Sequence, residues 1–195
     1  MNAATTGAVI LGGGYSRRFG DADKRLATLS NNLTVAATTV ATYCEAFAAC
    51  RVVLRTDDEA LAEILDPYPV KLVFTDEAAS GMGHSLAAGV RGLDWDWTFI
   101  ALLDMPYVCA ATLGQLREAT ATAGDAWIVR PRYRPAPETP AHPIGFHRAL
   151  LPELKTSRGD AGARHVLEAH RDQICWVDCD DIGIIRDIDA PEDLN

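Results

Sequence analysis

The chain has 195 residues, of which 48% are hydrophobic, so it is long enough to bury the core of a single domain. Its 18 lysines and arginines stand against 27 acidic residues, and the formal net charge of −9 argues against a general nucleic-acid-binding or membrane-surface protein. An anionic ligand must therefore be held by a local group of cations.

Short apolar runs that favour β-strands alternate with longer segments of helical periodicity through the first two thirds of the chain. Strands are predicted at residues 7–11, 51–55, 70–74, 97–103 and 126–130. Helices are predicted between them, at residues 34–49, 57–65, 84–93 and 110–123. Runs that are apolar on both faces are typical of central strands in a parallel sheet covered by helices on both sides. We therefore expect a three-layer α/β/α fold of the Rossmann-like type, with a mostly parallel sheet.

The remainder of the chain is less regular. Residues 130–143 are rich in proline, which breaks helices and interior strands, so this segment is either a plain surface loop or a substrate loop. Residues 144–154 and 159–170 favour helix in their later parts, and short strands are predicted at 174–178 and 183–188. A short helix is predicted at 190–194, with Pro191 near its start. Open α/β sheets bind ligands at the carboxyl ends of their strands, so the site is expected there.

The first predicted strand is followed by a turn rich in glycine and cations, whose residues are Gly12, Gly13, Gly14, Ser16, Arg17, Arg18 and Lys24. A dinucleotide-binding G-x-G-x-x-G turn is excluded because Arg17 stands where the third glycine is needed. A Walker A loop is excluded because Asp21 follows Gly20. Two interpretations remain: a structural turn with solvated arginines, or an anion site in which backbone N–H groups and cations surround a polyphosphate.

The stretch LGGGYSRRFGDADK, residues 11–24, resembles the L-A-G-G-x-S-x-R-F/M-G-x-x-D-K signature of the MobA-like nucleotidyltransferases. Four further blocks resemble that family in the same order: GMGHSLAAGV at 81–90, ALLDMP at 101–106, HPIGF with LPEL and GDAGAR between 142 and 164, and RDIDAPEDL at 186–194. The G-M-x-x-S-L form and the HPIGF and GDAGAR blocks are similar to the cytidylyltransferases of molybdopterin maturation. The resemblance implies one nucleotidyltransferase domain over residues 1–195, with the nucleotide-diphospho-sugar transferase type of fold.

The resemblance also implies which residues bind the nucleotide. They are Leu11, Gly12, Gly13, Gly14, Ser16, Arg18, Lys24, Gly81, Met82 and Ser85. Among them, Arg18 can grip phosphate oxygens bidentately, while Lys24 is a mobile point charge at the α/β bridge, and both are implied as catalytic. Ser85 either bonds the edge of the base or caps the predicted helix that follows Gly81.

A divalent cation is expected at Asp104, which ends the buried run FIALL. A carboxylate at the end of a buried strand needs a counter-charge, and the resemblance implies that Asp104 is catalytic and binds Mg²⁺ or Mn²⁺. The alternative is an aspartate that caps the next helix. Asp189 is expected as a second metal ligand; equally, Asp187 and Asp189, two residues apart, could form the polar face of a terminal strand.

The resemblance places the acceptor of the transferred nucleotide near the HPIGF and GDAGAR blocks. The residues implied are His142, Pro143, Gly159, Asp160, Gly162 and Arg164. A helix N-terminus with an arginine nearby can cradle a phosphate. The alternative for the GDAGAR block is an ordinary helix start with Asp160 as its N-cap.

The implied reaction moves CMP from CTP onto the phosphate of a molybdenum-cofactor pterin and releases pyrophosphate. Three alternatives stay open: a guanylyltransferase of the same family, a transferase acting on another small phosphate acceptor, and a non-catalytic accessory protein that binds the cofactor. The expected partners are a nucleoside triphosphate, the phosphorylated acceptor and a recipient molybdoenzyme, with no nucleic acid and no membrane.

Cysteine usage and the N-terminal sequence bear on the compartment. The five cysteines are dispersed, and none forms a C-x-x-C pair, which is typical of reduced, packed thiols. The first residues lack a basic segment followed by an apolar signal, and no apolar run reaches about 18 residues. We therefore expect a soluble cytoplasmic protein.

Overall fold

The computed structural model describes residues 4–14, 19 and 22–194. Ser16, Arg17 and Arg18, which the sequence places in the phosphate-binding turn, lie outside the described residues, so their predicted roles stay predictions. Within the described part, none of the helices combines the length and the apolar character needed to cross a lipid bilayer.

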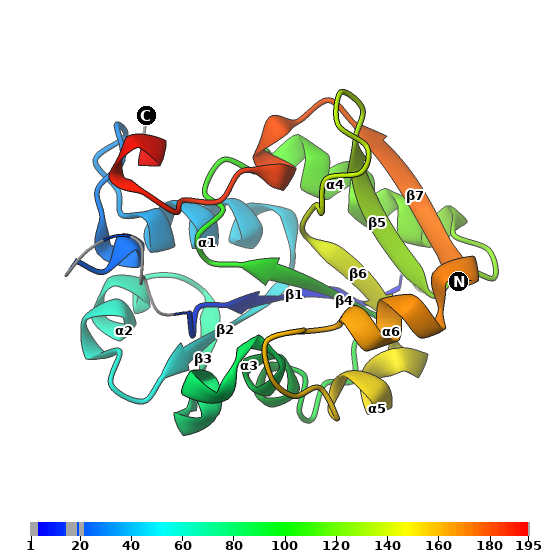
Figure 1. The fold of residues 1–195 in the computed structure, drawn as a ribbon, viewed down its shortest axis with the longest axis horizontal. Coiled ribbons are helices and arrows are strands. Elements are labelled where there is room, and N and C mark those ends of the chain that lie inside the picture. Colours follow the sequence, from blue (N-terminus) through cyan, green and yellow to red (C-terminus); the bar gives the residue numbers. More distant parts are fainter. Residues whose placement is uncertain (1–3, 15–18, 20–21, 195) are drawn as a thin grey trace.

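A seven-stranded sheet with the strand order β3-β2-β1-β4-β6-β5-β7 forms the centre of the fold (Figure 1). The strands are β1 (Thr6–Leu11), β2 (Ala49–Arg55), β3 (Val70–Thr75), β4 (Trp97–Leu102), β5 (Ile128–Tyr133), β6 (Ile144–His147) and β7 (Ile174–Cys179). Neighbouring strands are parallel, except that β6 runs antiparallel to both β4 and β5. The predicted mostly parallel sheet is therefore confirmed, with one reversed strand in its interior.

Helices cover both faces of the sheet, as Figure 1 shows with α1 and α4 on one side and α3, α5 and α6 on the other. The helices are α1 (Val35–Ala46), α2 (Glu59–Leu65), α3 (Met82–Gly89), α4 (Ala110–Thr122), α5 (Leu151–Leu154) and α6 (Arg164–Ala169). Alternate residues of β1 point to opposite faces: Ile10 packs in the cluster with α1 and α4, whereas Val9 packs in the cluster with α3, α5 and α6. The predicted three-layer α/β/α arrangement is confirmed.

The C-terminal segment differs from the prediction. Residues 182–185 form a 3-10 helix instead of a strand, and residues 186–189 have no regular structure. Tertiary contacts hold this segment: the Asp181 carboxylate accepts a hydrogen bond from the Gly183 amide at 2.9 Å, and the Ile188 amide donates to the Asp104 carbonyl at 2.8 Å. Because the chain follows these contacts rather than a sheet ladder, Asp187 and Asp189 do not share a strand face.

Candidate active site

The carboxyl ends of β1 and β4 open into a pocket of about 660 Å³. Parallel pairing sets Leu11 opposite Leu102, so the glycine turn after β1 and the Asp104 turn after β4 lie at the same edge of the sheet. The lining residues are Leu11, Gly12, Gly13, Gly14, Lys24, Arg25, Ala78, Ala79, Ser80, Gly81, Met82, Ser85, Leu102, Leu103, Asp104, Asp160 and Asp189. All the described residues predicted to bind nucleotide or metal line this one pocket.

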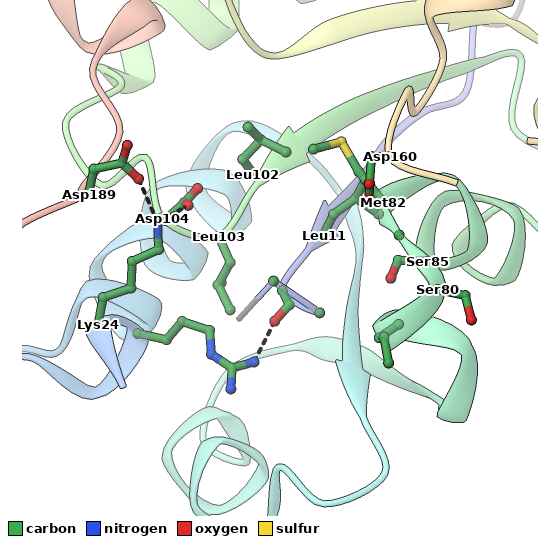
Figure 2. A pocket seen from close by; sticks show the side chains of 17 residues that line it. Leu11, Lys24, Ser80, Met82, Ser85, Leu102, Leu103, Asp104, Asp160 and Asp189 are labelled. Atoms are coloured by element: carbon green, nitrogen blue, oxygen red, sulfur yellow. Dashed lines mark hydrogen bonds and ion pairs between the residues drawn. The ribbon is translucent and has the colours of Figure 1, made fainter. Parts of the chain in front are cut away.

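Lys24 lies at the charged end of the pocket, between two carboxylates (Figure 2). Its Nζ is 2.7 Å from Oδ2 of Asp104 and 3.3 Å from Oδ1 of Asp189. Burial disfavours the charge, but Asp104 and Asp189 outweigh it and hold the pKa of Lys24 above its ordinary value. An ammonium group is thus kept charged beside the glycine turn.

Asp104 does not cap the following helix, since α4 begins after Cys109. Its carboxylate faces Lys24, and the Asp189 carboxylate reaches the same ammonium group from the C-terminal segment. Two hard oxygen ligands converging on one cation fit Mg²⁺ or Mn²⁺, which commonly takes one or two carboxylates and completes its shell with phosphate oxygens and water. Among the described residues no group of three or more His, Cys, Asp or Glu side chains is gathered as a metal site.

Two of the three glycines in the turn, Gly12 and Gly13, pack too closely for a side chain, whereas a Cβ atom on Gly14 would meet nothing within 4 Å. A Cβ atom on Gly13 would lie 2.7 Å from Oγ of Ser85, and one on Gly12 would lie 2.6 Å from Cδ2 of Leu103. The Gly12 amide donates to the Val53 carbonyl at 2.8 Å, which extends the β1–β2 ladder by one residue. The turn therefore continues directly from the sheet, with Gly13 and Gly14 on the wall of the pocket.

Arg25 holds this turn through a hydrogen bond to the Gly12 carbonyl, and its role was not predicted from the sequence. Its side chain is 3% exposed, and its guanidinium donates to the Gly12 carbonyl, to Asp23 and to Asp58. Burial raises the pKa of Asp58, but hydrogen bonds from Arg25 and Arg55 more than offset this and lower it below the ordinary range. No local pattern signals this network, because Asp58 is 33 residues away from Arg25 in the sequence.

The opposite end of the pocket is formed by the start of α3, where Figure 2 shows Ser85, Met82 and Asp160. Ser85 does not cap α3: the N-cap is Gly81, with no capping side chain, and Ser85 is 3% exposed within the helix. Gly81 has a φ of 113°, and a Cβ atom there would lie 2.3 Å from the carbonyl carbon of Gly159. Glycine is therefore needed at position 81 because the backbone of Gly159 occupies the space of a side chain. The sequence alone did not reveal this requirement.

A second pocket, of about 550 Å³, adjoins the first and shares Leu11 and Met82 with it. Three residues predicted to bind the acceptor line it: His142, Gly162 and Arg164. The other three lie elsewhere. Asp160 lines the first pocket, and Pro143 and Gly159 line neither of the two, with the Gly159 carbonyl accepting a hydrogen bond from Gly83 at 2.7 Å.

The helix after the GDAGAR block lies in the later part of residues 159–170, as predicted, and spans Arg164–Ala169. It is α6, which has Ala163 as N-cap without a capping side chain, so Asp160 is not its cap. Two further residues of the second pocket, Arg130 and Trp176, were not assigned to a site from the sequence. Trp176 was predicted in a strand, and β7 pairs it with Arg130 of β5; that both border a cavity is seen only in the folded structure.

Comparison with known proteins identifies the family. The model of the MobA-like NTP transferase domain matches residues 8–174. The purine catabolism protein PucB of Bacillus subtilis is 30% identical over 155 residues, covering 74% of this chain and 72% of that protein. The nicotine blue oxidoreductase of Paenarthrobacter nicotinovorans is 26% identical over 196 residues, covering 95% and 93%.

Solved structures share the fold. The crystal structure of Rv0371c from Mycobacterium tuberculosis has a TM-score of 0.80 and 25% identity, covering 99% of this chain and 96% of that one. A complex of Rv0371c with manganese has a TM-score of 0.76 and 22% identity, covering 97% and 95%. Because the family model spans most of the sheet and the whole first pocket apart from Asp189, this chain belongs to the MobA-like NTP transferase family of nucleotidyltransferases.

Proposed function

We propose that the protein transfers CMP from CTP to the phosphate group of a molybdenum-cofactor pterin and releases pyrophosphate. The observation that carries this proposal is the adjacency of the two pockets at Leu11 and Met82. One pocket has the glycine turn with Lys24, which suits a triphosphate, and the other has Arg130 and Arg164, which suit an anionic acceptor. A nucleotide and an acceptor bound there would meet at the shared boundary.

In the proposed reaction an oxygen of the acceptor phosphate forms a bond to the α-phosphorus of CTP. The bond from that phosphorus to the α–β bridging oxygen breaks, and its electron pair leaves with pyrophosphate. Such transfers depend mainly on positioning and on stabilising charge spread over oxygens. Amide N–H groups of the glycine turn and the Lys24 ammonium would donate hydrogen bonds to oxygens of the triphosphate, because both line the pocket proposed to hold it.

Asp104 and Asp189 would hold the divalent cation, which neutralises charge on the phosphates when it is bound. Their oxygens already converge on one cationic group, Nζ of Lys24, at 2.7 and 3.3 Å. In this proposal Lys24 exchanges its carboxylate partners for phosphate oxygens as the nucleotide enters. The choice of CTP rests on the G-M-x-x-S-L form at residues 81–86, whose Met82 and Ser85 lie at the end of the pocket away from Lys24.

The reaction is tested by measuring pyrophosphate release with Mg²⁺, the pterin acceptor and each of CTP, GTP, ATP and UTP. We expect release with CTP, and thermal stabilisation by CTP in excess of that by the other nucleotides. Stabilisation by GTP alone would favour guanylyl transfer. Absence of pyrophosphate release with every nucleotide would refute the transfer and leave the accessory-protein alternative.

One relative is named an oxidoreductase, so a redox activity is the competing possibility, and a second assay distinguishes it from nucleotidyl transfer. The sequence lacks the dinucleotide-binding G-x-G-x-x-G turn, because Arg17 occupies the position of the third glycine. We therefore expect no thermal stabilisation by NADH or NADPH at concentrations where CTP stabilises the protein. Stabilisation by NADPH but not by CTP would contradict the proposed function.

A further inference from the structure

Three carboxylates among the described residues line the first pocket, those of Asp104, Asp160 and Asp189. Asp104 and Asp189 face Nζ of Lys24 at 2.7 and 3.3 Å. Asp160 is exposed, and nothing in the described part of the chain forms an ion pair or a hydrogen bond with its carboxylate. A carboxylate without a counter-charge repels phosphate groups. Asp160 therefore suits a neutral part of a nucleotide rather than its triphosphate.

The carboxylate of Asp160 lies at the pocket wall, beside Gly81. A Cβ atom on Gly81 would be 2.6 Å from Oδ1 of Asp160, and both residues line the pocket. Figure 2 shows Asp160 on the side of Met82 and Ser85, across the pocket from Lys24. A nucleotide whose triphosphate lies at Lys24 would extend its base toward this end, where an exposed carboxylate oxygen is within its reach.

The turn that carries Asp160 is packed against the start of α3, backbone against backbone. The Gly83 amide donates to the Gly159 carbonyl at 2.7 Å. A Cβ atom on Gly83 would lie 2.6 Å from the backbone nitrogen of Arg158, so the two segments are in close contact. A group carried by a prearranged segment costs less to order when a ligand binds. Asp160 is therefore held at this end of the pocket before a nucleotide enters.

We propose that Asp160 selects the base, by accepting a hydrogen bond from the amino group at position 4 of cytosine. This role takes the place of the acceptor-binding role expected from the sequence. It rests on the proposed function, since it concerns the nucleotide of that reaction. A carboxylate accepts from the amino group of cytosine, whereas uracil has a carbonyl oxygen at the same position, which a carboxylate repels. Asp160 makes and breaks no bond to phosphorus and is a specificity-determining residue.

The selection is tested by binding alone, without an acceptor and therefore without turnover. Isothermal titration calorimetry compares CTP with UTP in the presence of Mg²⁺. A hydrogen bond to a charged group predicts that the wild type binds CTP about tenfold or more tightly than UTP. In Asp160→Asn the amide can donate to the carbonyl of uracil, so the ratio of the two affinities falls about tenfold. The lost negative charge affects both triphosphates alike, and the ratio therefore reports on the base.

Asp172→Asn is the matched control. Asp172 is exposed and belongs to neither pocket, so this substitution removes the same charge away from the site. The Asp172→Asn variant keeps the wild-type ratio of CTP to UTP affinity. Circular dichroism and Tm, measured for both variants, establish that each is folded.

A wild-type protein without preference for CTP over UTP, or an Asp160→Asn variant that keeps the wild-type ratio, would overturn the selection. Equal weakening of CTP and UTP in Asp160→Asn, absent for 2′-deoxycytidine triphosphate, would place the carboxylate at the ribose and would also overturn it. A protein that shows the predicted ratios but releases no pyrophosphate would instead contradict the proposed transfer, and the selection by Asp160 would stand.

Discussion

The guanidinium of Arg25 forms a two-pronged ion pair with the carboxylate of Asp58, with nitrogen–oxygen distances of 2.7 and 2.6 Å. Both side chains are 3% exposed, so the pair is shielded from solvent. Since Arg25 also donates to the Gly12 carbonyl, the pair connects Asp58, the N-cap residue of α2, with the start of the glycine turn.

Arg25→Met should lower the free energy of unfolding by about 3–5 kcal/mol, because it leaves a buried carboxylate with fewer partners. Urea denaturation measures the change. Arg134→Met is the control, since Arg134 pairs with Asp180 at the surface, where both side chains are more than half exposed, and its loss should cost less than about 1 kcal/mol. Equal effects of the two substitutions would show that the Arg25 network does not support the fold.

Asp58→Asn should change how stability depends on pH. The pKa of Asp58 is below its ordinary value in the folded protein, so its contribution is complete above about pH 5 and is lost as the pH falls through the lowered pKa. The free energy of unfolding of the variant should therefore lie furthest below that of the wild type near neutral pH, and the two should converge in acid. Parallel pH curves would contradict this role of Asp58.

Lys24→Met should reduce kcat/KM for CTP by about 100-fold or more, because one preorganised charge on the phosphates is lost. Pyrophosphate release measures the effect. Lys71→Met is the matched control, since Lys71 is an exposed residue of β3 outside both pockets. If the two variants retained similar activity, Lys24 would have no role in the transfer.

Asp104→Asn should lower activity by about 100-fold or more and weaken the binding of Mn²⁺ in the presence of CTP, as followed by electron paramagnetic resonance of the free ion. Removing divalent cations with a chelator should abolish turnover in the wild type, and added Mg²⁺ should restore it. Asp125→Asn, at an exposed turn, should change neither quantity. Transfer that is intact in Asp104→Asn would refute the metal-binding role.

Gly81→Ala should destabilise the protein by about 2 kcal/mol or more, because a positive φ and a collision with backbone act together. The new Cβ atom would lie 2.3 Å from the Gly159 carbonyl carbon. Gly92→Ala separates the two effects: Gly92 has a φ of 68°, but a Cβ atom there meets nothing within 4 Å, so the cost should be about 1 kcal/mol. Thermal or urea denaturation that ranks Gly92→Ala as the more damaging variant would exclude the close contact.

The sequence predicted the strands and helices that precede residue 130, because apolar periodicity and turn residues are local properties. The sequence and the resemblance also predicted that the glycine turn, Lys24, Gly81 and Asp104 would lie together, and all of them line the first pocket, because parallel strands bring their carboxyl ends to one edge. Arg25 and residues 78–80, which line the same pocket, were not predicted. It did not predict that Lys24 and Asp104 pair directly, because a counter-charge for Asp104 could equally be a metal. Neither Arg25 with Asp58 nor Arg130 with Trp176 was predicted, since each pair depends on contacts between distant strands and loops.

The conformation of the C-terminal region also depends on contacts between residues that are distant in the sequence, so local patterns did not predict it. Residues 183–188 carry a strand-like pattern, but contacts with Asp104 and Asp181 determine their conformation. The four residues of β6 are too few to show an alternation that separates a strand from the helices that follow. Its reversed direction is decided by pairing with β4 and β5, which local sequence does not encode.

The reversed direction of β6 determines how His142 reaches the second pocket. The beginning of β6 lies at the same edge of the sheet as the ends of β4 and β5, so His142 enters the pocket from a segment anchored at once by ladder hydrogen bonds. Ala141 is buried in the core and Arg134 is hydrogen-bonded to Cys179, so only the chain between residues 135 and 139 can lengthen or shorten without displacing His142. Of residues 134–141, only Pro140 and Ala141 line the second pocket, so a change of length before Pro140 would leave the rest of the pocket wall in place.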